Sequence, residues 1–99
     1  MDDAPSVRFP ELGFYTLAGG AQDPRVLIDE CRDAERLGLG TVFISERFNV
    51  KEAVTLSGAA AAATTRLQIM TAATNHNTRH PIVTASYATT MHRLTRGRF

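Results

Sequence analysis

Strand-like and helix-like segments alternate along this chain at nearly constant spacing. The strand-like segments begin near residues 12, 41, 67 and 98, which are 29, 26 and 31 residues apart. A barrel of eight strands and eight helices needs about 31 residues for each βα unit, and a doubly wound parallel sheet has a similar rhythm. The spacing therefore predicts an α/β fold, the N-terminal three βα units of a (β/α)8 TIM barrel (an incomplete barrel), with the doubly wound sheet as the alternative.

The first unit contains a clearly marked helix. Residues 12–17 predict a short buried strand, because they are rich in aromatic and β-branched side chains. Asp23 and Pro24 are typical of the N-cap and first position of a helix, and Gly38 is typical of its end. Between them, small and apolar residues recur at helical spacing: Leu27, Cys31, Ala34 and Leu37. This stripe predicts an amphipathic helix.

Two further units follow. Residues 41–45 predict a strand that is buried on both faces, and residues 52–65 predict the helix after it. Residues 67–73 predict the third strand, and Pro81 opens the third helix, which Gly97 caps. The apolar stripe expected on that helix comprises Val83, Tyr87, Met91 and Leu94. Arg98 and Phe99 resemble the approach to a fourth strand.

Composition narrows the possible functions. The net charge is +1, and only 7% of the residues are aromatic, with no Trp, which argues against a nucleic-acid surface. The N-terminus is acidic, and no apolar run is long enough for a signal peptide or a membrane span. The single Cys31 fits a reducing compartment. We expect a cytoplasmic protein that binds neither nucleic acid nor membrane, and no metal-binding spacing is present.

Polar residues follow the second predicted strand. Ligands of parallel α/β folds bind at the carboxyl ends of the strands, which selects the loops near residues 15–22, 45–49 and 71–80. Glu46 and Arg47 come directly after the second strand. A carboxylate and a guanidinium there can orient a substrate or stabilise developing negative charge. The alternative is an ordinary ion-pairing loop.

Other polar residues follow the third predicted strand. His76 is suited to proton transfer, and Asn75 and Asn77 can hydrogen-bond the polar edges of a flavin-type ring, although Asn also favours turns. We interpret His80 as a helix-entry residue.

Three further residues suggest structural roles. We interpret His92 as structural and the thiol of Cys31 as inert. Tyr15, at the end of the first strand, either lines the pocket or packs as an ordinary aromatic.

Several ordered motifs resemble one known family. They are the sequence DAERLG at 33–38, VFISERF at 42–48, TRHP at 78–81 and MHRLTRGRF at 91–99. In this order and spacing they resemble the bacterial luciferase-like family, and specifically its deazaflavin-dependent oxidoreductase branch, from residue 12 to residue 99. The resemblance implies a barrel whose pocket holds coenzyme F420, a deazaflavin, or alternatively FMN. It implies hydride transfer between the reduced deazaflavin and an unknown organic substrate, or, with FMN, insertion of one oxygen atom from O2.

The resemblance also implies roles for individual residues. Relatives often have an acid followed by His after the second strand, and these positions are Glu46 and Arg47 here, which makes them the expected catalytic pair. Deazaflavin-dependent relatives often carry a non-proline cis peptide behind the coenzyme ring, and it maps near Thr71, Ala72 and Ala73. With Asn75 and His76 these three residues form the expected cofactor-binding set, while no metal site is expected.

The length of the chain bears on whether it can be active by itself. We expect residues 1–99 to be the N-terminal part of a luciferase-like (β/α)8 domain, and the 99-residue chain alone to be inactive. We expect a small organic substrate, and either a homo-oligomer or the missing C-terminal part of the barrel as partner. The competing hypotheses are a non-catalytic truncated fragment and a doubly wound nucleotide-binding domain, for which Gly19 and Gly20 are a poor phosphate loop.

Overall fold

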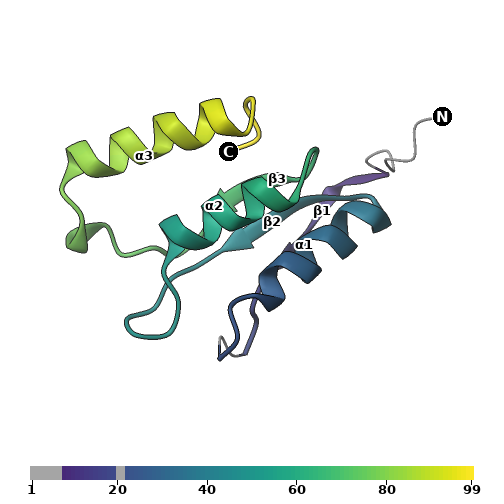
Figure 1. Cartoon of the computed structure of the whole chain (residues 1–99), viewed down its shortest axis with the longest axis horizontal. Coiled ribbons are helices and arrows are strands. Elements are labelled where there is room, and N and C mark those ends of the chain that lie inside the picture. The colour runs from purple at the N-terminus through teal and green to yellow at the C-terminus, as the bar shows by residue number, and fades with distance from the viewer. Residues whose placement is uncertain (1–7, 20–21) are drawn as a thin grey trace.

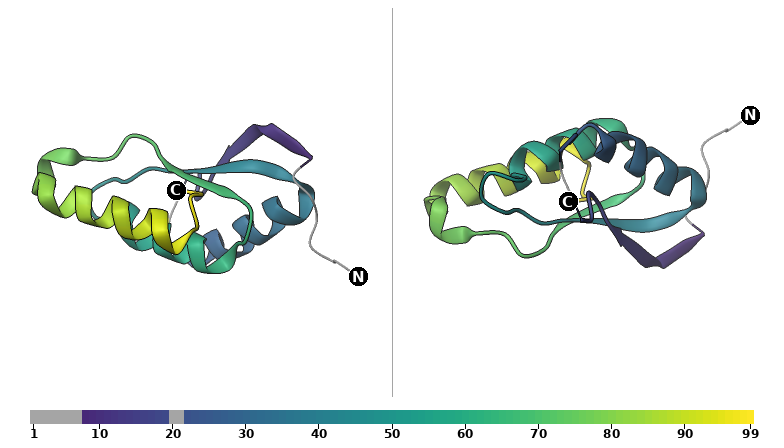
Figure 2. Two further views of the ribbon diagram at one scale, coloured as in Figure 1. Left: turned by 90° about the horizontal axis from the view of Figure 1, so that it is seen from above. Right: turned by 90° about the horizontal axis from the view of Figure 1, so that it is seen from below.

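Three parallel strands form one sheet, and the helices lie on one side of it (Figures 1 and 2). The computed structural model describes residues 8–19 and 22–99. The strands are β1 (Phe9–Tyr15), β2 (Leu39–Ile44) and β3 (Gln68–Thr71). The helices are α1 (Val26–Leu37), α2 (Ala53–Ala63) and α3 (Pro81–Leu94), with a short 3-10 turn, η1 (His76–Thr78). No helix in the described ranges is long and apolar enough to cross a bilayer.

The sheet confirms the predicted parallel architecture. Its order is β1-β2-β3, and both neighbouring pairs run parallel. Tyr15 pairs with Phe43, and Phe43 pairs with Met70, so these three residues form one row across the sheet. The strands begin 30 and 29 residues apart, which is more even than the spacing read from the sequence. All three strands therefore end at the same edge.

The core lies between the sheet and helices α1 and α2. Val42 and Ile44 of β2 are fully buried on this side, as are Leu27 and Cys31 of α1. On the opposite face Tyr15 is 47% exposed and Met70 is 50% exposed. The prediction that this strand is buried on both faces is therefore wrong: Val42 and Ile44 are buried on the helix side, but Phe43 on the opposite side is only partly buried, because the helices of the described chain cover only one face (Figure 2). We call the uncovered side the open face of the sheet.

The first helix begins later than the sequence predicts. Asp23 is not the N-cap of α1, because its side chain accepts a hydrogen bond from Arg25 N at 3.1 Å and so forms a turn ahead of the helix. The helix itself starts at Val26. Its end is as predicted, since Gly38 adopts the left-handed conformation with φ 85°.

The strand boundaries also differ from the predicted ones. β1 starts at Phe9 instead of residue 12, because the Arg8 and Phe9 amides both donate to the Gly38 carbonyl at 2.9 Å. β2 starts at Leu39, two residues earlier than expected, and β3 ends at Thr71 instead of residue 73. Element boundaries depend on such individual backbone contacts, which periodicity does not encode.

Helix α3 docks through its C-terminal half. Met91 is buried and Tyr87 is half-buried, where its ring meets Phe99 edge-to-face at 5.7 Å between centroids. The predicted stripe is wrong at its ends, since Val83 is 55% exposed and Leu94 is 61% exposed. The reason is that α3 packs beside α2, with no strand of the described chain beneath it (Figure 1).

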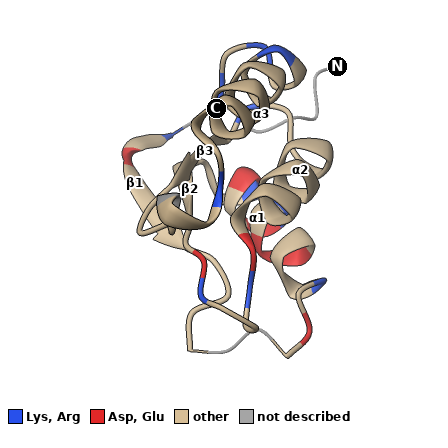
Figure 3. Ribbon diagram, turned by 90° about the vertical axis from the view of Figure 1, so that its left-hand side faces the viewer, with Lys and Arg blue, Asp and Glu red and all other residues tan. Residues whose placement is uncertain are grey.

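Two side chains secure the amino end of β3. The carboxylate of Glu35, on the acidic helix α1 (Figure 3), accepts hydrogen bonds from the Thr65, Arg66 and Leu67 amides. The guanidinium of Arg98 donates to the carbonyls of Thr64 and Leu67. These contacts satisfy backbone groups that burial would otherwise leave unpaired.

The backbone of Arg98 continues the sheet. Its carbonyl accepts from Ile69 N at 2.9 Å, on the side of β3 away from β2. This is the position that a fourth parallel strand would take, as the sequence predicts, although the described residues do not form a strand there.

The contact between β1 and β2 gives a stability prediction. A Cβ at Gly40 would collide with the Pro10 carbonyl oxygen and would lie 2.8 Å from its carbonyl carbon. Gly40→Ala should therefore lower the free energy of unfolding by about 1–3 kcal/mol in urea denaturation followed by circular dichroism. Gly58→Ala is the matched control, because a Cβ there meets nothing within 4 Å. In mid-helix it should raise stability by up to about 1 kcal/mol. Equal effects of the two substitutions would contradict this packing.

Candidate functional site

The candidate site lies where the three strands end. The loop after β2 contacts the loop after β3 directly: Glu46 N donates to the Ala73 carbonyl at 3.4 Å, and Asn75 N donates to Glu46 Oε1 at 2.8 Å. The parallel sheet therefore brings Glu46 and the 71–76 segment to one edge, as the sequence predicts. We call this edge the rim.

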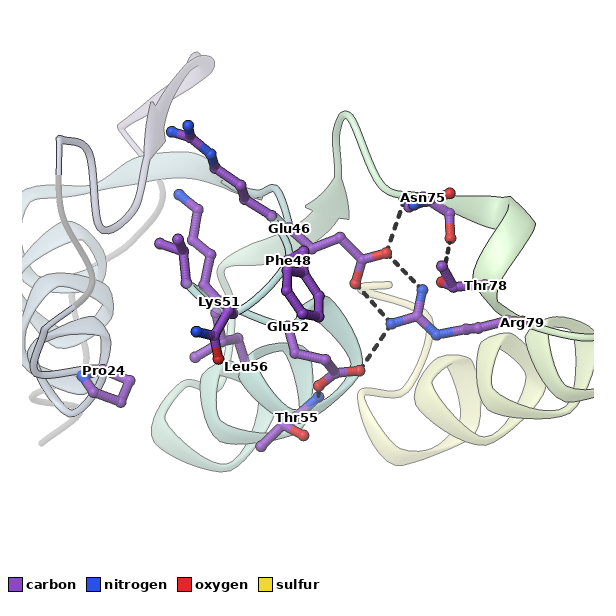
Figure 4. Close-up of a pocket in the computed structure, with 13 residues that line it drawn as sticks. Pro24, Glu46, Phe48, Lys51, Glu52, Thr55, Leu56, Asn75, Thr78 and Arg79 are labelled. Carbon is purple, nitrogen blue, oxygen red and sulfur yellow. Dashed lines mark hydrogen bonds and ion pairs between the residues drawn. The ribbon is translucent and has the colours of Figure 1, made fainter.

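A carboxylate and a guanidinium organise the rim (Figure 4). Arg79 binds Glu46 through two parallel hydrogen bonds of 2.7 Å, and its Nη2 also lies 2.8 Å from Glu52 Oε2. Glu46 Oε2 further accepts from Ala53 N at 3.0 Å, at the start of α2. The side chain of Glu46 is 8% exposed and that of Arg79 is 16% exposed. We call Glu46, Glu52 and Arg79 the rim cluster.

The rim cluster fixes the charge of Glu46. Hydrogen bonding to Arg79, aided by the amides of Ala53 and Asn75, outweighs burial and lowers the pKa of Glu46 from 4.5 to about 2. The two carboxylates in turn raise the pKa of Arg79. Glu46 is therefore ionised at neutral pH and positions the loops; in this arrangement it is not a proton donor.

Arg47 takes a different position from Glu46. It begins a tight turn in which its amide donates to the Lys51 carbonyl at 2.9 Å, and Asn49 at the tip has φ 59°. The guanidinium of Arg47 is exposed and makes no hydrogen bond with another described residue. The predicted pair is thus split, since Glu46 binds Arg79 while Arg47 faces solvent.

A cavity of about 590 Å³ opens beside this turn. Its lining includes the cationic side chains of Arg47 and Lys51, the rim cluster, and the apolar side chains of Phe48 and Leu56. Figure 4 shows Phe48 between Lys51 and the ion pair that Glu46 forms with Arg79. Such a mixed lining, with a few cations among apolar groups, is typical of small-molecule sites.

The end of β3 presents small residues at the rim. Thr71 ends the strand, and Ala72 and Ala73 are exposed. The expected non-proline cis peptide is wrong: the peptide bonds of the described residues here are trans. The chain turns instead through Ala73, which has φ 63°, while Ala72 N stays bonded to the Ile44 carbonyl at 2.8 Å.

Asn75 is a turn former in this structure. Its Oδ1 accepts from Asn77 N at 3.1 Å, and its carbonyl accepts from the Thr78 hydroxyl at 2.9 Å. His76 begins η1, and its side chain lies outside the described part of the structure. The 3-10 turn leads to α3, at whose N-cap His80 accepts from Ile82 N at 3.0 Å. This confirms the prediction that His80 is a helix-entry residue.

The remaining candidates have structural surroundings. Cys31 is fully buried, and burial raises the pKa of its thiol to about 12, which fits the predicted inert role. His92 Nδ1 lies 3.2 Å from the Phe99 carbonyl, in the helix remote from the rim. Tyr15 is at the rim but on the open face, where its hydroxyl contacts Ser45 and Lys51.

Sequence reasoning missed two cations, Arg79 and Lys51. Arg79 lies 33 residues from Glu46, so no local pattern joins them. A signal was nevertheless present, because Arg79 follows the third strand as Glu46 follows the second, and parallel strands end at a common edge. Lys51 follows an irregular turn, and the sequence does not show that this turn brings its side chain to Tyr15 of β1.

Comparison with known proteins identifies the family. The model of the luciferase-like monooxygenase family matches residues 9–99. A solved structure of coenzyme F420-dependent tetrahydromethanopterin reductase from Methanopyrus kandleri is similar to the chain, with a TM-score of 0.77 and 26% sequence identity. The similarity covers 95% of this chain and 26% of that chain, so the protein spans about a quarter of the reductase's length. No curated protein sequence matches it.

These findings define the class and then the family. The fold is α/β, three βα units of an incomplete TIM barrel. The chain belongs to the luciferase-like monooxygenase family, a family of oxidoreductases.

The rim cluster predicts a pH-dependent stability. Because the folded pKa of Glu46 lies near 2, below its ordinary 4.5, its contribution is present above pH 4.5 and is lost as the pH falls towards 2. Glu46→Gln should lower the free energy of unfolding by about 2–3 kcal/mol at neutral pH, and the difference should shrink on acidification. Urea titrations at several pH values measure it.

The matched control is Asp33→Asn, which removes an ion pair that is exposed on both sides. It should change stability by less than about 1 kcal/mol. A Glu46→Gln difference that stays constant from neutral pH to pH 2 would contradict the assigned charge state.

Proposed function

We propose that this protein is an oxidoreductase that transfers a hydride from a reduced deazaflavin coenzyme, F420, to a small organic substrate. The observation that carries this proposal is the likeness of 95% of the chain to a coenzyme F420-dependent reductase. Membership of the luciferase-like family supports oxidoreductase chemistry, without deciding between a deazaflavin and a flavin. The coenzyme, when bound, supplies the hydride, and the protein supplies binding, orientation and charge.

The residues at the end of β3 fit a planar ring. Ala72 and Ala73 are small and exposed, so the ring can approach their backbone closely. Asn75 comes two residues after Ala73, and its side-chain NH2 group makes no hydrogen bond with another described residue, which leaves two donors for a ring carbonyl. We therefore propose Thr71, Ala72, Ala73, Asn75 and His76 as the coenzyme-binding segment.

The residues after β2 take two separate roles in this proposal. Glu46 holds the loops after β2 and β3 together through Arg79. Arg47, exposed beside the cavity, binds an anionic group of the coenzyme or substrate. The role of Glu46 is positioning, because its carboxylate is already occupied by four hydrogen bonds.

Residues 1–99 act in this proposal as the N-terminal part of a (β/α)8 domain. The chain spans about a quarter of the reductase, and its open face carries exposed Tyr15 and Met70. Further βα units, in the same chain or from a partner, would cover this face and complete the pocket. The 99-residue chain alone would then be a non-catalytic fragment.

A second candidate is an FMN-dependent monooxygenase that inserts one oxygen atom from O2. The description of the matching family favours it. The two candidates differ in the ring that binds at the rim.

Coenzyme titration tests the proposal. The longest reading frame that contains this chain should bind F420 and quench its fluorescence, with an affinity at least about tenfold higher than for FMN, a difference of about 1.4 kcal/mol. Arg47→Ala should weaken the binding of F420 about fivefold or more, because it removes an exposed cation from the cavity.

Arg36→Ala is the matched control, since Arg36 is also exposed but pairs with Asp33 on α1. It should leave the affinity unchanged. Preferential binding of FMN would favour the monooxygenase, and binding of neither ring would exclude both candidates.

A further inference from the structure

Three polar side chains meet on the open face of the rim. The hydroxyl of Tyr15, at the end of β1, lies 2.5 Å from Ser45 Oγ, just past the end of β2. Lys51 Nζ, from the turn after β2, donates to the same hydroxyl at 2.6 Å. The ammonium also lies 4.2 Å from the centre of the Tyr15 ring. We call these three residues the Tyr15 triad.

The Tyr15 triad is separate from the rim cluster. Tyr15 and Phe43 are a register pair, and the ring of Phe43 lies against Gly13 on the open face. Glu46, by contrast, points towards the start of α2, whose first amide it binds. The triad is accessible as well, since Tyr15 is 47% exposed. Tyr15 therefore presents part of its side chain to a molecule on the open face.

The triad also lies near the proposed coenzyme-binding segment. Tyr15 is in register with Met70 across β2, and Ala72 comes two residues after Met70. Two strand spacings separate β1 from β3, or about 10 Å. A small planar molecule between them would contact Phe43 and Met70 below and reach the Tyr15 hydroxyl at its edge.

The surroundings make the phenol a better acid. The hydrogen bond from Lys51, with further support from Ser45, lowers the pKa of Tyr15 from its ordinary value of 10.0. Among the described residues, Lys51 is the charged group that contacts Tyr15, and β2 contributes only the uncharged Ser45. An ammonium at this distance stabilises the phenolate that remains after a proton is given away.

We propose that Tyr15 is the general acid of this site, positioned by Lys51 and Ser45, and that the substrate is a compound with a polar C=O or C=N bond. This inference rests on the proposed hydride transfer. The hydride adds to the carbon of the double bond with its electron pair, and the π electrons move to the oxygen or nitrogen. That atom takes the proton from Tyr15 Oη. The phenolate is held by Lys51 and Ser45, and it regains a proton from water.

Titration of the phenol tests the triad in the 99-residue chain itself. The chain has two tyrosines and no tryptophan, so in a Tyr87→Phe background the ultraviolet absorption of tyrosinate reports Tyr15 alone. The midpoint should lie below 10.0, rise on adding Lys51→Met, and stay low with Lys51→Arg. A midpoint at or above 10.0, or one that does not respond to Lys51→Met in a folded variant, overturns the triad.

Turnover tests the acid role. With reduced F420 and trifluoroacetophenone as hydride acceptor, Tyr15→Phe in the longest reading frame should lower kcat about 100-fold or more and leave the affinity for F420 unchanged. The wild-type rate should fall at alkaline pH as Tyr15 ionises, and Lys51→Met should move that fall to higher pH. Equal rates for wild type and Tyr15→Phe would overturn the inference alone. A wild type that binds no F420 would instead overturn the proposed function on which it rests.

Discussion

The ion pair between Glu46 and Arg79 is the interaction on which the shape of the rim depends. It joins the loops that follow β2 and β3, and the same carboxylate caps the start of α2. Both side chains are largely withdrawn from water, so each compensates for the charge that the other carries into this site. Two segments are arranged around this pair: the turn that carries Arg47 and Lys51, and the segment from Ala72 to Asn75.

Much of this arrangement could be predicted from the sequence, because parallel strands end at one edge. That rule alone placed Glu46 beside the segment 71–76, and the backbone contact between Glu46 and Ala73 confirms the placement. The partner of Glu46 could not be predicted in the same way. Arg47 is adjacent in sequence, but it turns to solvent, and the true partner comes from another loop 33 residues away.

Other details escaped prediction for local reasons. The sequence predicts Asp23 as the N-cap of a helix, but its side chain accepts a hydrogen bond from Arg25 N in a turn before the helix. An N-cap and such a turn use the same kind of side-chain hydrogen bond to a backbone amide, so the sequence does not distinguish them. From the sequence, Tyr15 is predicted only to line the pocket or to pack as an ordinary aromatic. Its hydroxyl is instead bound by Lys51, which an irregular turn brings back to β1. Hydrophobic periodicity carries no information about the path of such a turn.

The two ends of the sheet are secured by separate sets of side chains. At the amino end, Glu35 and Arg98 hold the start of β3 through contacts with backbone groups and with the Thr64 hydroxyl, and no group of the rim takes part. Descendants of this sequence can therefore alter the loops that meet a ligand while the opposite end preserves the strand order. Because different residues hold the two ends, a change in a loop at the rim leaves the contacts at the opposite end intact.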